Sequence, residues 1–179
     1  GADHAALTGE YASIPEEMGK VAAFFGKEVL RDVKEGEVLA ALPKLRTEVG
    51  DRAVLRALHF YADDRRAVEE ADALERKDAD TFLELVRQSG RSSWELLQNI
   101  TPAGAVEAQD MAVALAAAEI ALDGKGACRV HGGGFAGTIQ VFVPTEDRET
   151  FREKMENMLG EGCCHVLGIR PVGGVVLAD

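Results

Sequence analysis

The spacing of apolar side chains changes once along the chain, near residue 125. Before that point, apolar residues recur three and four positions apart, which is the period of an amphipathic helix. After it, short runs rich in β-branched residues are separated by glycines, a pattern typical of strands and turns. The sequence therefore predicts an α+β protein with a large set of helices and a small, mainly antiparallel sheet.

Local start and stop signals divide the first part into separate helices. Two segments, Ser13–Glu16 and Ser92–Glu95, match the capping box, in which a Ser hydroxyl and a Glu carboxylate satisfy each other's backbone N–H groups. Ser89-Gly90 is expected to break a helix. The predicted helices run from Pro15 to Gly26, Gly36 to Leu42, Asp51 to Lys77, Asp78 or Asp80 to Ser89, and Pro102 to Asp123.

The second part alternates strands with one helix. That helix is capped by Thr145 and closed by Gly160. The order of elements is that of half a split βαβ sandwich, and its three-stranded sheet keeps one bare edge. We therefore expect a further strand before Gly1. The predicted strands are Cys128–His131, Thr138–Val143 and His165–Ile169, with a fourth strand or a frayed end at Gly174–Leu177.

Charge and length narrow the class of protein. The 179 residues include 20 Lys and Arg against 31 Asp and Glu, so the net charge is -11. The acidic residues are spread evenly, without the clusters of Lys and Arg that hold nucleic acid or an anionic membrane. A hydrophobic content of 46% is enough to bury a core. We expect one folded domain that binds neither polyanion.

The termini and cysteines predict a cytoplasmic fragment. No apolar run reaches the roughly 18 residues of a membrane span, and no basic-then-apolar signal peptide opens the chain. Three cysteines, two of them adjacent, make a poor disulfide framework, which favours a reducing compartment. The chain begins at Gly1 without an initiator Met, so we expect a piece of a longer protein.

A glycine cluster is the sharpest local feature. Gly132, Gly133 and Gly134 lie between two predicted strands, where glycine lets the backbone approach a ligand and direct N–H groups at an anion. A tightly bent hairpin connection explains them equally well. His131 beside them either contacts phosphate or acts as an acid or base, or is a hydrogen-bonded structural residue. The cluster matches neither the Walker loop nor the Rossmann fingerprint.

Other candidate chemistry is sparse. The histidines lack partners at metal-ligand spacing, and Cys163-Cys164 lacks a second pair of ligands, so we expect no metal site. A charged helix face with Asp63 and Glu70 is interpreted as solvated surface. Tyr11 either stacks on or hydrogen-bonds a sugar, or packs as a staple against a helix start.

The segment Arg129–Gly137 resembles the third signature motif of the GHMP small-molecule kinases. Within that superfamily it most resembles the galactokinases, whose pattern is Arg-Met-Thr followed by Gly-Gly-Gly-Phe-Gly-Gly. Further matches to this family lie at His4–Tyr11, Lys27–Val33 and Arg56–His59. The resemblance covers nearly the whole chain, in order.

The resemblance implies that residues 1–179 are the C-terminal GHMP domain of a kinase that transfers the γ-phosphoryl of ATP, with Mg²⁺, to the anomeric hydroxyl of galactose. Tyr11 matches the tyrosine that lines the galactose pocket. The glycine loop, with Gly132, Gly133, Gly134, Phe135 and Gly137, lies against the active-site cleft, and Phe135 anchors it by packing. The sequence departs from the family at Val130, His131 and Ala136, which puts the contacts of His131 in question.

The family's catalytic residues and phosphate loop belong to an N-terminal domain that this chain lacks. The expected partners are therefore that domain, galactose and ATP, and the fragment alone is expected to be inactive, with no catalytic residue of its own and no cofactor bound tightly. Three alternatives stay open: a non-catalytic sugar sensor of galactokinase-like fold, a free-standing binding module, and a GHMP kinase for another small-molecule alcohol.

Overall fold

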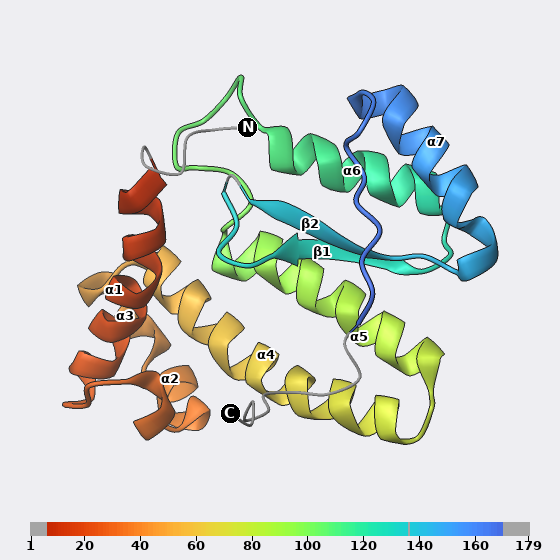
Figure 1. The fold of residues 1–179 in the computed structure, drawn as a ribbon. Helices are drawn as coiled ribbons and strands as arrows, with labels where there is room; N and C mark the ends of the chain where they lie inside the picture. The colour runs from red at the N-terminus through yellow and green to blue at the C-terminus, as the bar shows by residue number, and fades with distance from the viewer. Residues whose placement is uncertain (1–6, 136, 170–179) are drawn as a thin grey trace, which may run out of the picture.

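A computed structural model describes residues 7–135 and 137–169, and its elements follow the predicted division (Figure 1). Helices fill the first part and one pair of strands follows. The helices are α1 (Thr8–Phe24), α2 (Glu35–Ala40), α3 (Leu42–Glu48), α4 (Asp51–Glu75), α5 (Ala79–Ser92), α6 (Asp110–Leu122) and α7 (Arg148–Leu159), and the strands are β1 (Ala127–His131) and β2 (Thr138–Phe142). The predicted α+β class is confirmed.

The two strands form an antiparallel pair enclosed by helices. Their register joins Ala127 to Phe142 at one end and His131 to Thr138 at the other. In Figure 1 the strands lie between α5 on one side and α6 on the other, with α7 beside α6. A Cβ on Gly90 would lie 3.0 Å from the Cys128 carbonyl oxygen, so glycine at this point allows α5 to approach β1 closely.

Buried apolar side chains form two separate clusters. The first joins α1 to α4 and includes Val21, Leu45 and Val54. The second joins α6, α7 and the strands and includes Leu115 and Val130. α4 and α5 pack along each other between them. The molecule therefore has two cores joined by a helix pair.

The first helix begins earlier than its capping box predicts. α1 starts at Thr8, Pro15 lies inside it, and the Ser13 hydroxyl donates a 2.7 Å hydrogen bond to the Glu10 carbonyl. The prediction was wrong because local signals do not register tertiary contacts. Buried Leu7 and the packing of Tyr11 hold a first turn that propensity alone does not specify.

Two further helix boundaries were also predicted wrongly. Ser89-Gly90 does not break α5, which runs to Ser92 and continues as a π-helical turn over Ser93–Leu97. The predicted box at Ser92 fails because its hydroxyl is buried against the His59 ring, 2.8 Å from Nδ1. α6 begins at Asp110 rather than Pro102, since the intervening loop contains Gly104 in a left-handed conformation.

The predicted third strand does not form in the described part of the chain. Residues 165–169 pair with no strand there, and Leu167 is 86% exposed. An extended apolar segment becomes a strand only when a neighbour takes its backbone hydrogen bonds. The fourth predicted strand, Gly174–Leu177, lies outside the described residues. Within the described ranges, each helix is too short or too polar to cross a membrane.

Candidate functional site

The glycine loop between β1 and β2 has an anchored base and an exposed tip. Gly132 and Gly133 are exposed, whereas Gly134 is buried and Phe135 is only 4% exposed. The Phe135 N–H donates a 2.7 Å hydrogen bond to the Asn99 carbonyl oxygen. The Asn99 side-chain amide donates to the Gly133 carbonyl at 3.3 Å. Asn99, just after the π-helical turn, therefore holds the base of the loop.

Glycine is required at Gly134. Its φ is +86°, and a Cβ built there would lie 2.0 Å from the Asn99 carbonyl oxygen. Gly132 also has a positive φ, +70°, but no atom lies within 4 Å of its Cβ position. Gly134 must be glycine because of the close approach of Asn99, whereas Gly132 favours glycine only because of its backbone conformation.

Tyr11 of α1 packs directly on this loop. Its hydroxyl donates a 3.0 Å hydrogen bond to the Gly134 carbonyl, and its ring meets Phe135 edge-on with centroids 5.4 Å apart. A Cβ on Gly133 would lie 2.8 Å from a Tyr11 ring carbon. Tyr11 and the glycine loop, which were singled out in distant parts of the sequence, are therefore in direct contact in the fold.

His131 lies at the end of β1 with an exposed side chain. Gly137 donates its N–H to the Gly134 carbonyl at 3.1 Å, which closes the loop at its far end. His131 therefore faces outward beside the exposed tip of the loop. The Gly137 hydrogen bond helps to fix the shape of the loop.

A partly buried polar network lies behind β1, and charge patterning along the sequence did not indicate it. Arg129 donates to the Ser89 hydroxyl at 2.6 Å, and that hydroxyl donates to the Asp63 carboxylate at 2.6 Å. Asp63 also accepts from Arg66 at 3.0 Å, and its other oxygen lies 3.6 Å from the His59 ring. Asp63 is therefore not the solvated surface residue that its charged neighbours indicated. Its acidic neighbour Asp64 does lie at the surface, paired with Arg31.

His59 is held neutral by this setting. Burial lowers its pKa from the ordinary value of 6.5, and the charges of Arg66 and Arg129 lower it further, against the opposing charge of Asp63. Its Nδ1 lies 2.8 Å from the Ser92 hydroxyl. A buried neutral imidazole with fixed partners is a packing element of α4 and α5 rather than a solvent-facing acid or base.

A second buried group connects α1 to the segment that holds the loop. The Arg56 side chain is 0% exposed and donates to the Leu97 carbonyl at 3.0 Å, two residues before Asn99. It also donates to Glu17 at 2.9 Å. Burial opposes ionisation of Glu17, but the hydrogen bond from Arg52 and the charge of Arg56 outweigh it, so the pKa of Glu17 is lowered.

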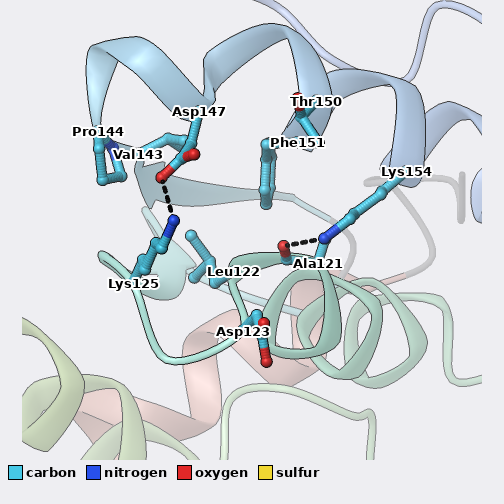
Figure 2. Close-up of a pocket in the computed structure, with 10 residues that line it drawn as sticks. All are labelled: Ala121, Leu122, Asp123, Lys125, Val143, Pro144, Asp147, Thr150, Phe151 and Lys154. Atoms are coloured by element: carbon cyan, nitrogen blue, oxygen red, sulfur yellow. Dashed lines mark hydrogen bonds and ion pairs between the residues drawn. The ribbon is translucent and has the colours of Figure 1, made fainter.

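Two of the hollows in the described residues differ in character. A groove of about 440 Å³ lies between α5, the π-helical turn and α6 along β1, with Trp94 and Leu115 among its walls. A much smaller cavity of about 60 Å³ lies under α7 (Figure 2). There Lys125 pairs with Asp147 at 3.0 Å and Lys154 donates to the Ala121 carbonyl at 3.4 Å. These two contacts fasten α7 and the turn before it to the end of α6.

Comparison with known proteins places the chain beside galactokinases. Its sequence is 31% identical over 149 residues to the galactokinase of Actinobacillus pleuropneumoniae serotype 3 (strain JL03), covering 83% of this chain and 37% of the relative. It is 29% identical over 150 residues to the galactokinase of Glaesserella parasuis serovar 5 (strain SH0165), again covering 37% of that protein. No family model matches the sequence.

The fold has a counterpart among solved structures. A crystal structure of Lactococcus lactis galactokinase complexed with galactose superposes with a TM-score of 0.66 at 20% identity, over 88% of this chain and 38% of that chain. The chain therefore shares the α+β fold of part of that galactokinase structure. The resemblance to galactokinases carried by its motifs is confirmed, and the chain spans a little over a third of the length of the relatives it matches.

Proposed function

We propose that residues 1–179 act as the C-terminal domain of a galactokinase. In the complete protein, ATP would phosphorylate galactose at its anomeric hydroxyl, and an N-terminal GHMP domain would supply the phosphate loop, the catalytic base and the metal ligands. The observation that carries the proposal is similarity to galactokinases over 83% of the chain, which includes the glycine loop. Substrate, cofactor and partner follow from those relatives.

In this proposal the glycine loop borders the active site through its exposed tip. The base is held by Asn99 and buried Phe135, so Gly132 and Gly133 are presented on an anchored support. An anchored loop of exposed backbone suits phosphoryl transfer, because that chemistry depends on positioning and electrostatic stabilisation. His131, exposed at the edge of the tip, is the side chain with the best placement for a further contact.

The proposal assigns Tyr11 to the galactose pocket. Its ring packs on Gly133 and its hydroxyl holds Gly134, so any substrate that reached the loop tip would lie close to it. For the complete enzyme we predict that Tyr11→Phe raises KM for galactose more than KM for ATP. Steady-state kinetics with each substrate varied in turn would check this, and equal changes in both constants would contradict the sugar-contact role.

ATP and Mg²⁺ are assigned to the N-terminal domain. The described residues contain no cluster of three or more His, Cys, Asp or Glu side chains that would hold a metal ion. Three free cysteines, none paired as a disulfide, are compatible with a cytoplasmic enzyme. The chain on its own is therefore proposed to be inactive.

A domain-exchange experiment tests the proposal. The isolated chain should release no ADP from ATP in the presence of galactose. Joined to the N-terminal part of the Actinobacillus pleuropneumoniae galactokinase, in place of that protein's matching segment, it should restore galactose-dependent ADP release. A folded chimera that binds galactose without turnover would favour the sugar-sensing alternative. Turnover of another alcohol, but not of galactose, would favour a different GHMP kinase.

A further inference from the structure

Two adjacent thiols converge at the surface after α7. Cys163 is exposed, Cys164 is half-buried, and their Sγ atoms lie 3.8 Å apart. Consecutive side chains of an extended strand point to opposite faces, so this convergence is not the default for neighbouring residues. It follows a tight turn at Glu161-Gly162, where Gly162 has a φ of +78° and donates its N–H to Glu156 at 3.3 Å.

The pair is held on one side by the protein. Cys164 packs against the apolar cluster of α6, α7 and the strands, whereas Cys163 has no such cover. Burial raises the pKa of the Cys164 thiol to about 11, and the neighbouring Cys163 thiol and Glu156 raise it as well, while Arg152 opposes them. At neutral pH Cys164 is therefore a protonated thiol with a fixed position.

These features disfavour a disulfide between the two residues. Consecutive Cα atoms across a trans peptide are about 3.8 Å apart, less than the roughly 4.4–6.8 Å that disulfides span. An atom that bonds to both sulfurs, so that no S–S bond forms, fits the 3.8 Å separation of the two Sγ atoms better.

We propose that Cys163 and Cys164 form a dithiol site for a trivalent arsenical. Arsenic(III) has pyramidal bonding, so it holds two sulfurs at an angle and needs only one further substituent. With an arylarsenoxide the reaction is RAs=O + 2 R′SH → RAs(SR′)2 + H2O. Two As–S bonds form, the As=O bond is lost, and both thiol protons leave in water, with no change in oxidation state. The site is independent of the proposed kinase function.

The third cysteine provides an internal comparison. Cys128 is buried in β1, its thiol donates to Glu119 at 3.3 Å, and burial together with the Glu119 charge raises its pKa to about 12. It lacks a neighbouring thiol and access to solvent. Because it is present in every variant below, any reaction at Cys128 is common to all of them.

Phenylarsine oxide tests the site on the chain as it stands. Intact-mass spectrometry should show one phenylarsenic group per chain, removed by a small dithiol such as dithiothreitol but retained against the same excess of a monothiol. Cys163→Ser, at an exposed position, and Cys164→Ser should each weaken binding by about 100-fold or more, because the second As–S bond is then no longer intramolecular. Circular dichroism should show that Cys163→Ser keeps the helical content of the parent chain.

Equal affinity in the parent chain and in Cys163→Ser would overturn the proposal. So would separate phenylarsenic groups mapped to Cys163 and to Cys164, or removal by the monothiol, since each result would mean that the two sulfurs react separately. The parent chain and Cys163→Ser decide these outcomes, so a failure of Cys164→Ser to fold would leave the test intact.

Discussion

At the scale of single residues, the glycine loop separates two reasons for having glycine. Gly134 faces the Asn99 carbonyl so closely that a methyl group has no room, whereas Gly132 faces open space. Both have positive φ angles. Comparing the two positions therefore isolates steric overlap from backbone strain.

We predict that Gly134→Ala destabilises the chain by about 3 kcal/mol or more, because overlap with Asn99 adds to the strain of a left-handed residue. Gly132→Ala is the matched control and should cost only about 1–2 kcal/mol from backbone conformation. Urea unfolding monitored by circular dichroism measures both. Equal losses would mean that the loop moves away from Asn99 without cost.

His59 should make stability depend on pH. Its pKa is lowered in the folded state by burial, so the unfolded chain binds the proton more tightly. The stabilisation is complete above the unfolded value near 6.5 and is lost as pH falls from there toward the folded pKa. The free energy of unfolding should therefore fall from about pH 7 to pH 5.5, with a contribution from His59 of up to about 1.4 kcal/mol per pH unit.

His59→Gln keeps a polar side chain but removes this titration. Its unfolding free energy should change less across the same pH interval than that of the parent chain. The rest of the sequence is the same in both proteins, so the difference in slope belongs to His59. Parallel pH profiles would rule out a lowered pKa at this residue.

At the scale of elements, α1 is joined to α4 by one carboxylate between two arginines. Glu17 accepts from Arg52 at 2.6 Å and from Arg56 at 2.9 Å. Arg56 is fully buried, and one of its terminal nitrogens has no partner in the described part of the chain. Removing the carboxylate would leave a buried cation without its counter-charge.

We predict that Glu17→Gln costs about 3 kcal/mol of stability, the lower end of the cost of breaking a buried ion pair. Glu16→Gln is the matched control on the same helix, since Glu16 pairs only with exposed Lys20. That change should cost less than about 0.5 kcal/mol. Thermal unfolding of the two variants would compare them, and similar losses would show that Glu17 is not structurally distinct from its neighbour.

The elements also show what a single sequence can and cannot predict. Helical periodicity located α4 almost correctly, and Asp78 caps α5 as expected through a 3.1 Å hydrogen bond from the Thr81 N–H. Local signals failed where distant residues decide. Ser92 has the residue type of a helix cap, but its hydroxyl lies against the His59 ring. Gly90 has the residue type of a helix breaker, but it lies inside α5 where β1 approaches closely.

The same limit applies to the candidate site. Tyr11 and the glycine loop were both singled out from sequence, but their contact across 123 positions was not visible there. Asn99 carried no signal, and the signal at Asp63 was misinterpreted, because such a polar residue's role depends on partners that only the fold supplies. Charge patterning alone assigned Asp63 to the surface.

At the scale of the whole molecule, we expect the two apolar clusters to act as two cooperative units joined by α4 and α5. Leu45 is fully buried in the first and Leu115 is buried in the second. The clusters are linked by the packing of α4 on α5 and of α5 on β1, and by the polar network of Asp63 and Ser89. Such an arrangement favours partial opening of one unit while the other stays folded.

We predict that Leu45→Ala and Leu115→Ala each destabilise the chain by about 2–5 kcal/mol. Hydrogen exchange should distinguish them. Leu45→Ala should increase exchange chiefly in α1, α2 and α3, and Leu115→Ala chiefly in α6, α7 and the strands. A uniform increase across the chain in both variants would show a single cooperative unit instead.

The link between Phe135 and Asn99 has a consequence for how this sequence can diverge. It joins one backbone N–H to one backbone carbonyl, so exchanging either side chain leaves the bond in place. Only proline at 135 would remove the donor. Substitutions at neighbouring positions such as Val130 and His131 therefore leave the donor and the acceptor of this bond in place. Both atoms of this hydrogen bond belong to the main chain, so most side-chain substitutions leave them unchanged.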